Sequence, residues 1–382
     1  MSENEATSEQ PREQPSGSSV GVLIMAYGTP QSPVDIEKYY THIRRGRPPT
    51  PEQLEDLVSR YDAIGGISPM RNRTDAQVEA VRRALNSMAL DDVNTVSGLA
   101  SRTQREFVVT LGQKHATPFI EDGVEDLIKA GVSIIVGLVL APHFSAASVG
   151  QYHDRARDAI AGRVEYSPID DWSLEPAFID FTASSLRTQL DSMPERTTVV
   201  FTAHSLPERV LQSDPYRENL TASAAAIAEE AGLGSDWMIG WQSAGRTPEP
   251  WAGPDILEII AGLASDATGE AAGADGSDES DHERGILVVP QGFTSDHLEI
   301  LYDLDIEARS VAASAGLTLE RTETINADPE VMAALAARIS TAVSAGVAGG
   351  DAARCAANGC AVPSETDSGV YSADQDHGGS HP

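Results

Sequence analysis

Three carboxylates recur every four residues in the stretch PQGFTSDHLEILYDLDIEA, residues 290–308. They are Glu299, Asp303 and Glu307, and in an α-helix this spacing puts all three on one face. Because like charges so placed repel each other by about a few tenths of a kcal/mol per pair, helix propensity does not explain the row. One interpretation is a solvated acidic helix face. The other is a row of carboxylates that handles a divalent cation or moves protons.

His204 is the second residue suited to metal or proton chemistry. It ends an apolar run in VVFTAHSLPERV and is soon followed by Pro207, which restricts the turn. A structural histidine bonded to nearby backbone is the alternative interpretation. Taken with the carboxylate row, His204 predicts a site of histidine and carboxylate for a divalent metal. His143, in LAPHFSAAS, is expected to be a supporting residue.

Tyr27 and a group of arginines are the remaining candidates. Tyr27 ends the first apolar run, in VLIMAYGTP, and is either an aromatic at a sheet edge or a phenol that stacks on or ligates something in a cleft. The run HIRRGR, residues 42–47, places three arginines in a strongly acidic chain. They either interact with the negative end of a helix dipole or form a cationic island for carboxylates. Arg60, Tyr61 and Ser68 in SRYDAIGGISPM would extend such an island.

Short apolar runs alternate with amphipathic segments along the chain, and this pattern predicts the strands and helices that carry these residues. Six runs resemble strands buried on both faces, as in parallel sheets: residues 21–26, 106–111, 132–140, 197–203, 237–241 and 286–289. Segments 74–88, 119–130, 175–190 and 216–231 predict helices between most of them. Such units imply right-handed crossovers and an α/β fold of doubly wound parallel sheets. Ligands of such sheets bind beyond the carboxyl ends of the strands, so the residues expected near a site are Tyr27, His143, His204, Gln242, Ser243 and 291–297.

A chain of 382 residues suggests two domains. We expect a disordered tail at 1–19, domains at 20–162 and 163–328, a helix at 329–348 that packs back on the N-terminal half, and a disordered tail at 349–382. The domain boundary is expected near residues 162–168, and the acidic stretch at 266–284 is expected to be a disordered insertion. The helix with the carboxylate row is expected to begin near His297, capped by Ser295 or Asp296.

The net charge of −31 argues against binding nucleic acid or an anionic membrane surface, because the long-range field repels phosphates. No apolar run reaches the roughly 18 residues of a spanning helix, and no signal peptide is recognisable, so we expect a cytoplasmic protein. The turns lack the glycine spacing of a phosphate loop, which gives nucleotide use little support. Cys355 and Cys360 alone cannot complete a four-ligand metal site.

Several of these motifs together resemble the ferrochelatase family, and within it the coproporphyrin III type. The motifs are MAYGTP, YYTHIRRGRPP, RYDAIGGISP, LAPHFS, TAHSLPERV and GFTSDHLEILYDLDIEA, in family order, and the resemblance extends from about Val20 to Val347. It implies two Rossmann-like domains with a porphyrin cleft between them. It also implies insertion of ferrous iron, as a substrate, into a tetrapyrrole without an organic cofactor.

The resemblance assigns roles residue by residue. His204 and Glu299 match the iron-handling and catalytic positions, and Tyr27 matches the axial ligand on the opposite face of the porphyrin. The porphyrin site is expected to be lined by Tyr27, Arg44, Arg60, Tyr61, Ser68 and Tyr152. Asp303 and Glu307 are expected to relay protons or a hydrated cation toward solvent.

The expected substrate is coproporphyrin III, which gives the iron porphyrin coproheme on the route to heme b. A tyrosine in MAYGTP is typical of this type, and a basic island suits a porphyrin with four propionates. The alternatives are protoporphyrin IX as substrate, a cobalt or nickel chelatase, and a heme-binding protein without activity. With only Cys355 and Cys360 present, no [2Fe-2S] cluster of the actinobacterial kind is expected. We expect a monomer without stable membrane association.

Overall fold

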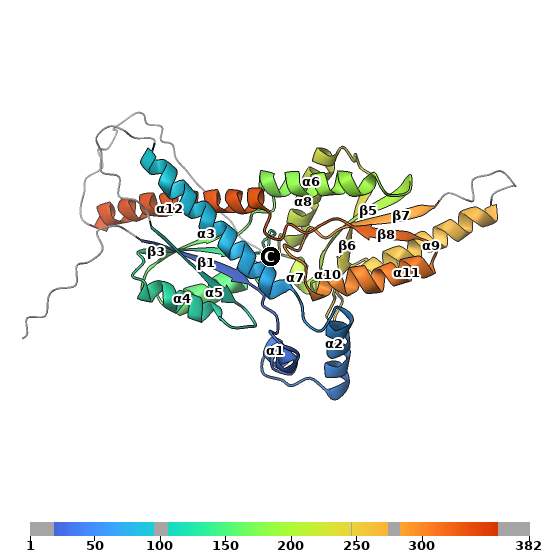
Figure 1. Ribbon diagram of the computed structural model, residues 1–382, viewed down its shortest axis with the longest axis horizontal. Helices are drawn as coiled ribbons and strands as arrows, with labels where there is room; N and C mark the ends of the chain where they lie inside the picture. Colours follow the sequence, from blue (N-terminus) through green and yellow to red (C-terminus); the bar gives the residue numbers. More distant parts are fainter. Residues whose placement is uncertain (1–18, 95–105, 246, 274–282, 358–382) are drawn as a thin grey trace, which may run out of the picture. The chain divides into compact units, whose positions relative to one another are not determined.

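The computed structural model of the protein describes residues 19–94, 106–245, 247–273 and 283–357 (Figure 1). The chain divides into two compact units, Met1–Val343 and Ser344–Pro382, and both sheets belong to the first unit. Each sheet has four strands, and every strand pairing is parallel. The expected α/β class with two parallel, helix-covered sheets is therefore confirmed.

The first sheet has the strand order β2-β1-β3-β4. Its strands are β1 (Val20–Ala26), β2 (Phe107–Gln113), β3 (Ile134–Val139) and β4 (Glu165–Ile169). The helices in this half are α1 (Ile36–Ile43), α2 (Pro51–Ala63), α3 (Met70–Asn94), α4 (Ile120–Lys129) and α5 (Gln151–Ile160), with a 3-10 turn at Pro33–Asp35 and a π-helical turn at Ala146–Gly150. All residues of β1 and β3 are buried, because helices cover both faces of the sheet.

The second sheet has the strand order β6-β5-β7-β8. Its strands are β5 (Arg196–His204), β6 (Trp237–Gln242), β7 (Arg284–Val289) and β8 (Thr318–Arg321). The helices in this half are α6 (Pro176–Leu190), α7 (Glu208–Leu211), α8 (Tyr216–Ala231), α9 (Ile256–Gly273), α10 (Leu298–Leu301), a π-helix at Asp303–Ala308 and α11 (Arg309–Ser314). The last described helix, α12 (Pro329–Ala357), has buried residues up to Val343 in a core cluster that includes strands of both sheets. Among the described residues, no helix is both long enough and apolar enough to span a membrane.

One apolar core cluster joins the two sheets. It contains Ile24 of β1, Val81 of α3 and Phe201 of β5, together with Leu335 and Ile339 of α12. Separate clusters fill the other face of each sheet, under α4 and α5 in the first and under α9 and α11 in the second. Figure 1 shows α3 on the opposite side of the first sheet from α4 and α5. This shared core holds the strand ends of both halves in one compact unit.

Helix α2 carries two of the expected site residues and has a well-defined start. Thr50 accepts a hydrogen bond from the Gln53 backbone, the Gln53 side chain accepts one from Thr50, and Pro51 occupies the first turn. This capping box fixes where the helix begins, and so which face carries Arg60 and the buried Tyr61.

Strands β4 and β8 were not among the expected strands. Both lie at sheet edges, where one side of the strand is unpaired and the apolar pattern is weak. β4 reads EYSPI with Pro168, a residue tolerated at edges, and β8 has only four residues. The expected limits of the domains stay a prediction. One strand does not follow them: β4 lies beyond residue 162, the expected end of the first domain, yet it pairs with β3 in the first sheet.

Two helices extend beyond the expected limits. α9 continues to Gly273, into the stretch expected to be a disordered insertion, and α12 continues to Ala357, past the expected end at 348. Both extensions are rich in alanine, which has the highest helix propensity. The remaining expected tails and insertion, at 1–18, 274–282 and 358–382, lie outside the described residues.

Candidate functional site

The structure brings His204 and Glu299 together from positions 95 residues apart. His204 is the last residue of β5, and Glu299 lies in the first turn of α10, which follows β7. Their contact joins His204 Nδ1 to Glu299 Oε2 at 3.0 Å. β5 and β7 are neighbours in one parallel sheet, so their carboxyl ends emerge side by side. The expected pairing of histidine and carboxylate is therefore present in the geometry.

Each residue of this pair shifts the pKa of the other toward its charged form. Burial disfavours ionisation of Glu299, but His204 and His297 outweigh that effect and hold the pKa of the carboxyl well below its usual range. Burial likewise disfavours the imidazolium of His204, but Glu299 and Asp303 raise the pKa of His204 above its usual value. His297 Nε2 lies 3.7 Å from Glu299 Oε2. Glu299 is thus held as an anion by two histidines near its Oε2.

Asp303 forms a second acidic position near the pair. Its Oδ2 accepts a hydrogen bond of 2.5 Å from the Ser243 hydroxyl, and its Oδ1 lies 3.4 Å from Arg60 Nη1. Burial, followed by the charge of Glu299, raises the pKa of Asp303 to about 6. A carboxyl group with this pKa binds and releases protons near neutral pH.

The three carboxylates do not form the straight helical row that their spacing predicted. After α10 the backbone changes to a π-helix at Asp303–Ala308, in which Glu307 N donates to Tyr302 O over five residues. The expected cap of this helix was also wrong. The N-cap residue of α10 is His297, not Ser295 or Asp296, and its side chain makes no capping hydrogen bond. A wider turn rotates the following side chains, so four-residue spacing does not stack them. Glu307 is half-buried and acts on Asp303 by its charge alone.

Tyr27 lies directly after β1, at the same end of the fold. The residue as a whole is 39% exposed, while burial of its phenol and the charge of Glu299 raise the pKa of that phenol well above its usual value. The ring centroid of Tyr27 lies 4.6 Å from that of His115. Tyr61 is buried, and burial raises the pKa of its phenol to about 12, with a contribution from Glu299. The charge of Glu299, which follows β7 of the second sheet, therefore raises the pKa of Tyr27 and Tyr61 in the first half.

A ferrochelatase family model matches residues 19–343. The chain belongs to the ferrochelatase family. Relatives named coproporphyrin III ferrochelatase include that of Geobacillus thermodenitrificans, 42% identical over 83% of this chain and 94% of the relative, and that of Bacillus subtilis, 40% identical over 83% and 96%. The expectation of a ferrochelatase-type enzyme is confirmed. Among solved structures, SirB from Bacillus subtilis with Fe3+ aligns over 85% of this chain and 95% of that chain, with 12% identity and a TM-score of 0.44.

The other residues expected to line the porphyrin site of this ferrochelatase have local partners. The Arg44 guanidinium lies over the Tyr40 ring, 5.4 Å from its centroid, and Arg44 Nε donates to Arg47 O. Ser68 is buried and accepts a hydrogen bond from Met70 N at the start of α3. Tyr152 is buried in α5. For these residues, a role in binding porphyrin stays a prediction.

His143 lies in the interior, and the supporting role expected of it stays a prediction. It is 2% exposed, and its Nε2 lies 2.7 Å from Ser223 Oγ, which in turn donates to Gln291 Oε1. Burial lowers the pKa of His143 to about 4, so the ring is neutral at pH 7. A neutral, enclosed imidazole links the segment after β3 to α8 and to the segment after β7.

Several residues around the pair were expected near a site, but their partners were not. Gln242 Nε2 donates to the backbone oxygen of Glu299, and Ser243 holds Asp303. Gln242 is the last residue of β6 and Ser243 follows it, so the strand-end rule located both without naming their contacts. His115 was missed, because the second apolar run ends at Leu111 while β2 continues to Gln113.

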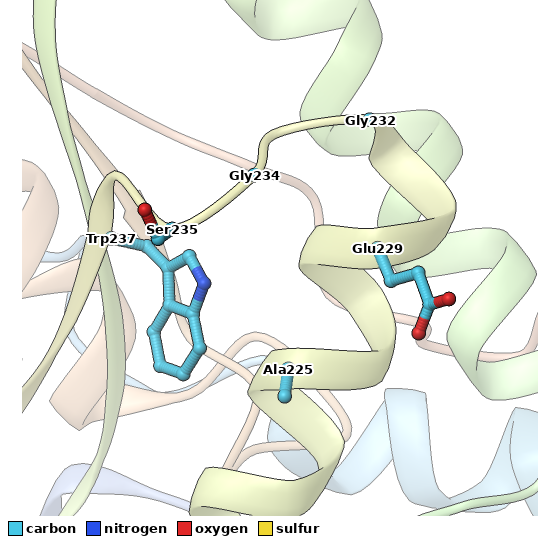
Figure 2. Close-up of a pocket in the computed structure, with 6 residues that line it drawn as sticks. All are labelled: Ala225, Glu229, Gly232, Gly234, Ser235 and Trp237. Atoms are coloured by element: carbon cyan, nitrogen blue, oxygen red, sulfur yellow. The ribbon is translucent and has the colours of Figure 1, made fainter.

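Two pockets in the second half contain none of the expected site residues. The larger one has a volume of about 560 Å³. Figure 2 shows its lining, which includes Glu229 of α8 and Trp237 at the start of β6. The other, of about 280 Å³, lies where β5 and β7 begin. Within the described part of the chain, no group of three or more His, Cys, Asp or Glu residues is arranged to hold a metal ion.

Proposed function

We propose that this ferrochelatase inserts ferrous iron into coproporphyrin III. The observation that carries the proposal is the contact of His204 with Glu299 at the carboxyl ends of β5 and β7. The relatives named coproporphyrin III ferrochelatase, at about 40% identity over most of the chain, support the choice of substrate. So does the tyrosine in MAYGTP, which is typical of the coproporphyrin type.

Metal insertion requires that two protons leave the inner nitrogens of the porphyrin while Fe2+ loses its water. His204 contacts Glu299 through Nδ1, and its Nε2 has no hydrogen-bond partner among the described residues. We assign the first steps to this pair: it binds the arriving cation through nitrogen and oxygen and accepts a proton from the porphyrin. Each pyrrole N–H bond that breaks yields one proton to the protein, and the nitrogen lone pairs bind the iron.

Asp303 is the proposed next proton carrier. Its pKa of about 6 allows it to take a proton and release it again near neutral pH. Glu307, half-buried in the same π-helix, is the proposed exit toward solvent. Tyr27 is the proposed axial ligand on the other face of the macrocycle, and Arg44, Arg60, Tyr61, Ser68 and Tyr152 are the proposed porphyrin contacts.

We propose further that the enzyme works without a [2Fe-2S] cluster. Cys360 and the side chain of Cys355 lie outside the described residues, so this rests on the cysteine count alone. A monomeric state, a cytoplasmic location and the lack of stable membrane association also remain predictions.

The test is an anaerobic absorbance assay with Fe2+ and either coproporphyrin III or protoporphyrin IX. The wild type is expected to convert coproporphyrin III faster. His204→Ala is expected to lower kcat by about a hundredfold or more, since a positioned acid–base group contributes about 10²–10⁴. Its melting temperature should stay near that of the wild type, because the side chain is 40% exposed. A wild type that metallates neither porphyrin would refute the proposal.

A further inference from the structure

Lys114 and His115 continue from the end of β2 alongside Tyr27. The backbone nitrogen of Lys114 donates to Ala26 O, and that of His115 donates to Tyr27 O, each at 2.9 Å. The two residues therefore flank the end of β1 at the sheet edge where ligands of parallel sheets bind. Neither was among the residues expected to line the site.

Positive charge gathers around Lys114. Its Nζ lies 4.9 Å from the centroid of the Tyr152 ring and donates to Gln151 Oε1 at 2.8 Å. Burial, followed by the charges of Arg155 and Arg45, lowers the pKa of Lys114 to about 8. Each of these positive charges disfavours the others. The cluster therefore costs free energy unless an anion binds to it.

Glu121, an acidic residue near this cluster, is already paired with Arg155. Both oxygens of Glu121 are bound by Arg155, at 2.9 and 2.6 Å. Across the described residues, neither Lys114 nor Arg45 forms an ion pair with an acidic side chain. In a protein with 58 acidic and 27 basic side chains, two cations without an acidic partner at the candidate site run against the overall charge.

Arg45 is held in a backbone conformation that disfavours a side chain. Its φ of +56° lies in the left-handed region, which costs a residue other than glycine about 1–2 kcal/mol. The helix that precedes it is tied to the Lys114 segment, because His42 Nδ1 lies 3.0 Å from His115 Nδ1. The exposed Arg45 thus follows a helix that contacts the Lys114 segment, and its charge acts on Lys114.

We propose that Lys114 and Arg45 together bind one carboxylate of the tetrapyrrole and so determine porphyrin specificity, a role that rests on the proposed function. Coproporphyrin III carries propionates at two ring positions where protoporphyrin IX carries vinyl groups. A carboxylate that reaches Lys114 forms charge-assisted hydrogen bonds and relieves the repulsion among the cations. A vinyl group at the same place leaves those cations without an anion.

The test measures porphyrin affinity by fluorescence titration, which needs no turnover. Lys114→Met keeps an unbranched side chain and removes the charge. It is expected to weaken coproporphyrin III binding about tenfold, because a hydrogen bond to a charged group contributes about 1.5 kcal/mol. Binding of protoporphyrin IX should change less than about twofold, a margin of about 0.4 kcal/mol. Arg45→Ala should act in the same direction, and Lys114→Arg should restore selectivity.

Lys129→Met is the matched control, since Lys129 is 72% exposed in the last turn of α4. It should leave both affinities unchanged. An equal loss for the two porphyrins in Lys114→Met, or no loss for coproporphyrin III, would overturn the inference. If the wild type inserts no iron but Lys114→Met still weakens coproporphyrin III selectively, the proposed function fails and this carboxylate site stands.

Discussion

Ser243 offers a direct way to change the proton affinity of Asp303. Its hydroxyl donates to Asp303 Oδ2 at 2.5 Å, while Arg60 lies on the other carboxylate oxygen. Burial and the charges of Glu299 and Glu307 raise the pKa of Asp303, whereas Ser243 and Arg60 lower it, and the balance is about 6. Removing Ser243 leaves the burial and both acidic charges in place, so the pKa must rise.

The size of the change follows from the hydrogen bond. A bond to a charged group contributes about 1.5–3 kcal/mol, which corresponds to about one to two pKa units. In Ser243→Ala, the pKa of Asp303 is therefore expected between about 7 and about 8. If Asp303 accepts the porphyrin protons, it must be ionised, and the acidic limb of the kcat profile should move to higher pH by the same amount.

The assay is kcat for iron insertion against pH, measured anaerobically for the wild type, Ser243→Ala and Ser243→Gly. Ser243 has a φ of +59°, which glycine adopts without penalty. Both variants should show the same pH shift, while Ser243→Gly should be more stable than Ser243→Ala by about 1 kcal/mol. Profiles that coincide with the wild type in both variants would refute the role of Asp303 as proton carrier.

The same pKa predicts how stability depends on pH. The pKa of Asp303 is higher in the folded protein than its ordinary 3.8, so between about pH 4 and pH 6 the folded state binds more protons than the unfolded state. The contribution of this group to stability therefore falls as pH rises through that window. In Ser243→Ala the fall should continue to about pH 8, as measured by urea unfolding across the range.

Three other changes test separate features of the structure. Glu299→Gln removes the main partner that raises the pKa of His204, so burial should bring that pKa below its wild-type value in an NMR titration; an unchanged value would contradict the pairing. Gly112→Ala should destabilise the fold by about 1–3 kcal/mol in urea unfolding, because its Cβ would lie 2.8 Å from Ile120 Cα; equal stability would show that the backbone yields there. Raising ionic strength from about 0.1 M to about 1 M shortens the Debye length from about 10 Å to about 3 Å. It should raise the melting temperature of this chain of net charge −31, and a flat response would contradict self-repulsion.

The sequence predicts the sheets well where strands are buried. The six apolar runs all became strands, since a strand covered on both faces must be apolar along its length. The edge strands β4 and β8 escaped prediction, because burial on fewer sides leaves a weaker pattern. The approach of His204 to Glu299 followed from the rule that parallel strands end at one edge, combined with the resemblance in motif.

The details of the site depend on backbone features that residue spacing does not encode. The π-helix is defined by the bond from Glu307 N to Tyr302 O, and no pattern in DLDIEA distinguishes it from an α-helix. The left-handed turns at Arg45 and Ser243 are equally invisible, since neither residue favours positive φ. Lys114 was missed for a different reason: it lies beyond the end of the apolar run that predicted β2.

Neighbouring acids of the π-helix have different partners and therefore different charge environments. Asp305 is bound by Arg321 through both oxygens, at 2.7 and 2.9 Å, which ties it to the end of β8. Asp303, two residues earlier, faces Ser243 and Arg60 and has a pKa of about 6. An acid bound through both oxygens by arginine is held ionised, whereas an acid buried near another carboxylate has a raised pKa, which suits the proton transfer proposed for Asp303. Local partners, more than the four-residue spacing, therefore determine the charge environment of each carboxylate.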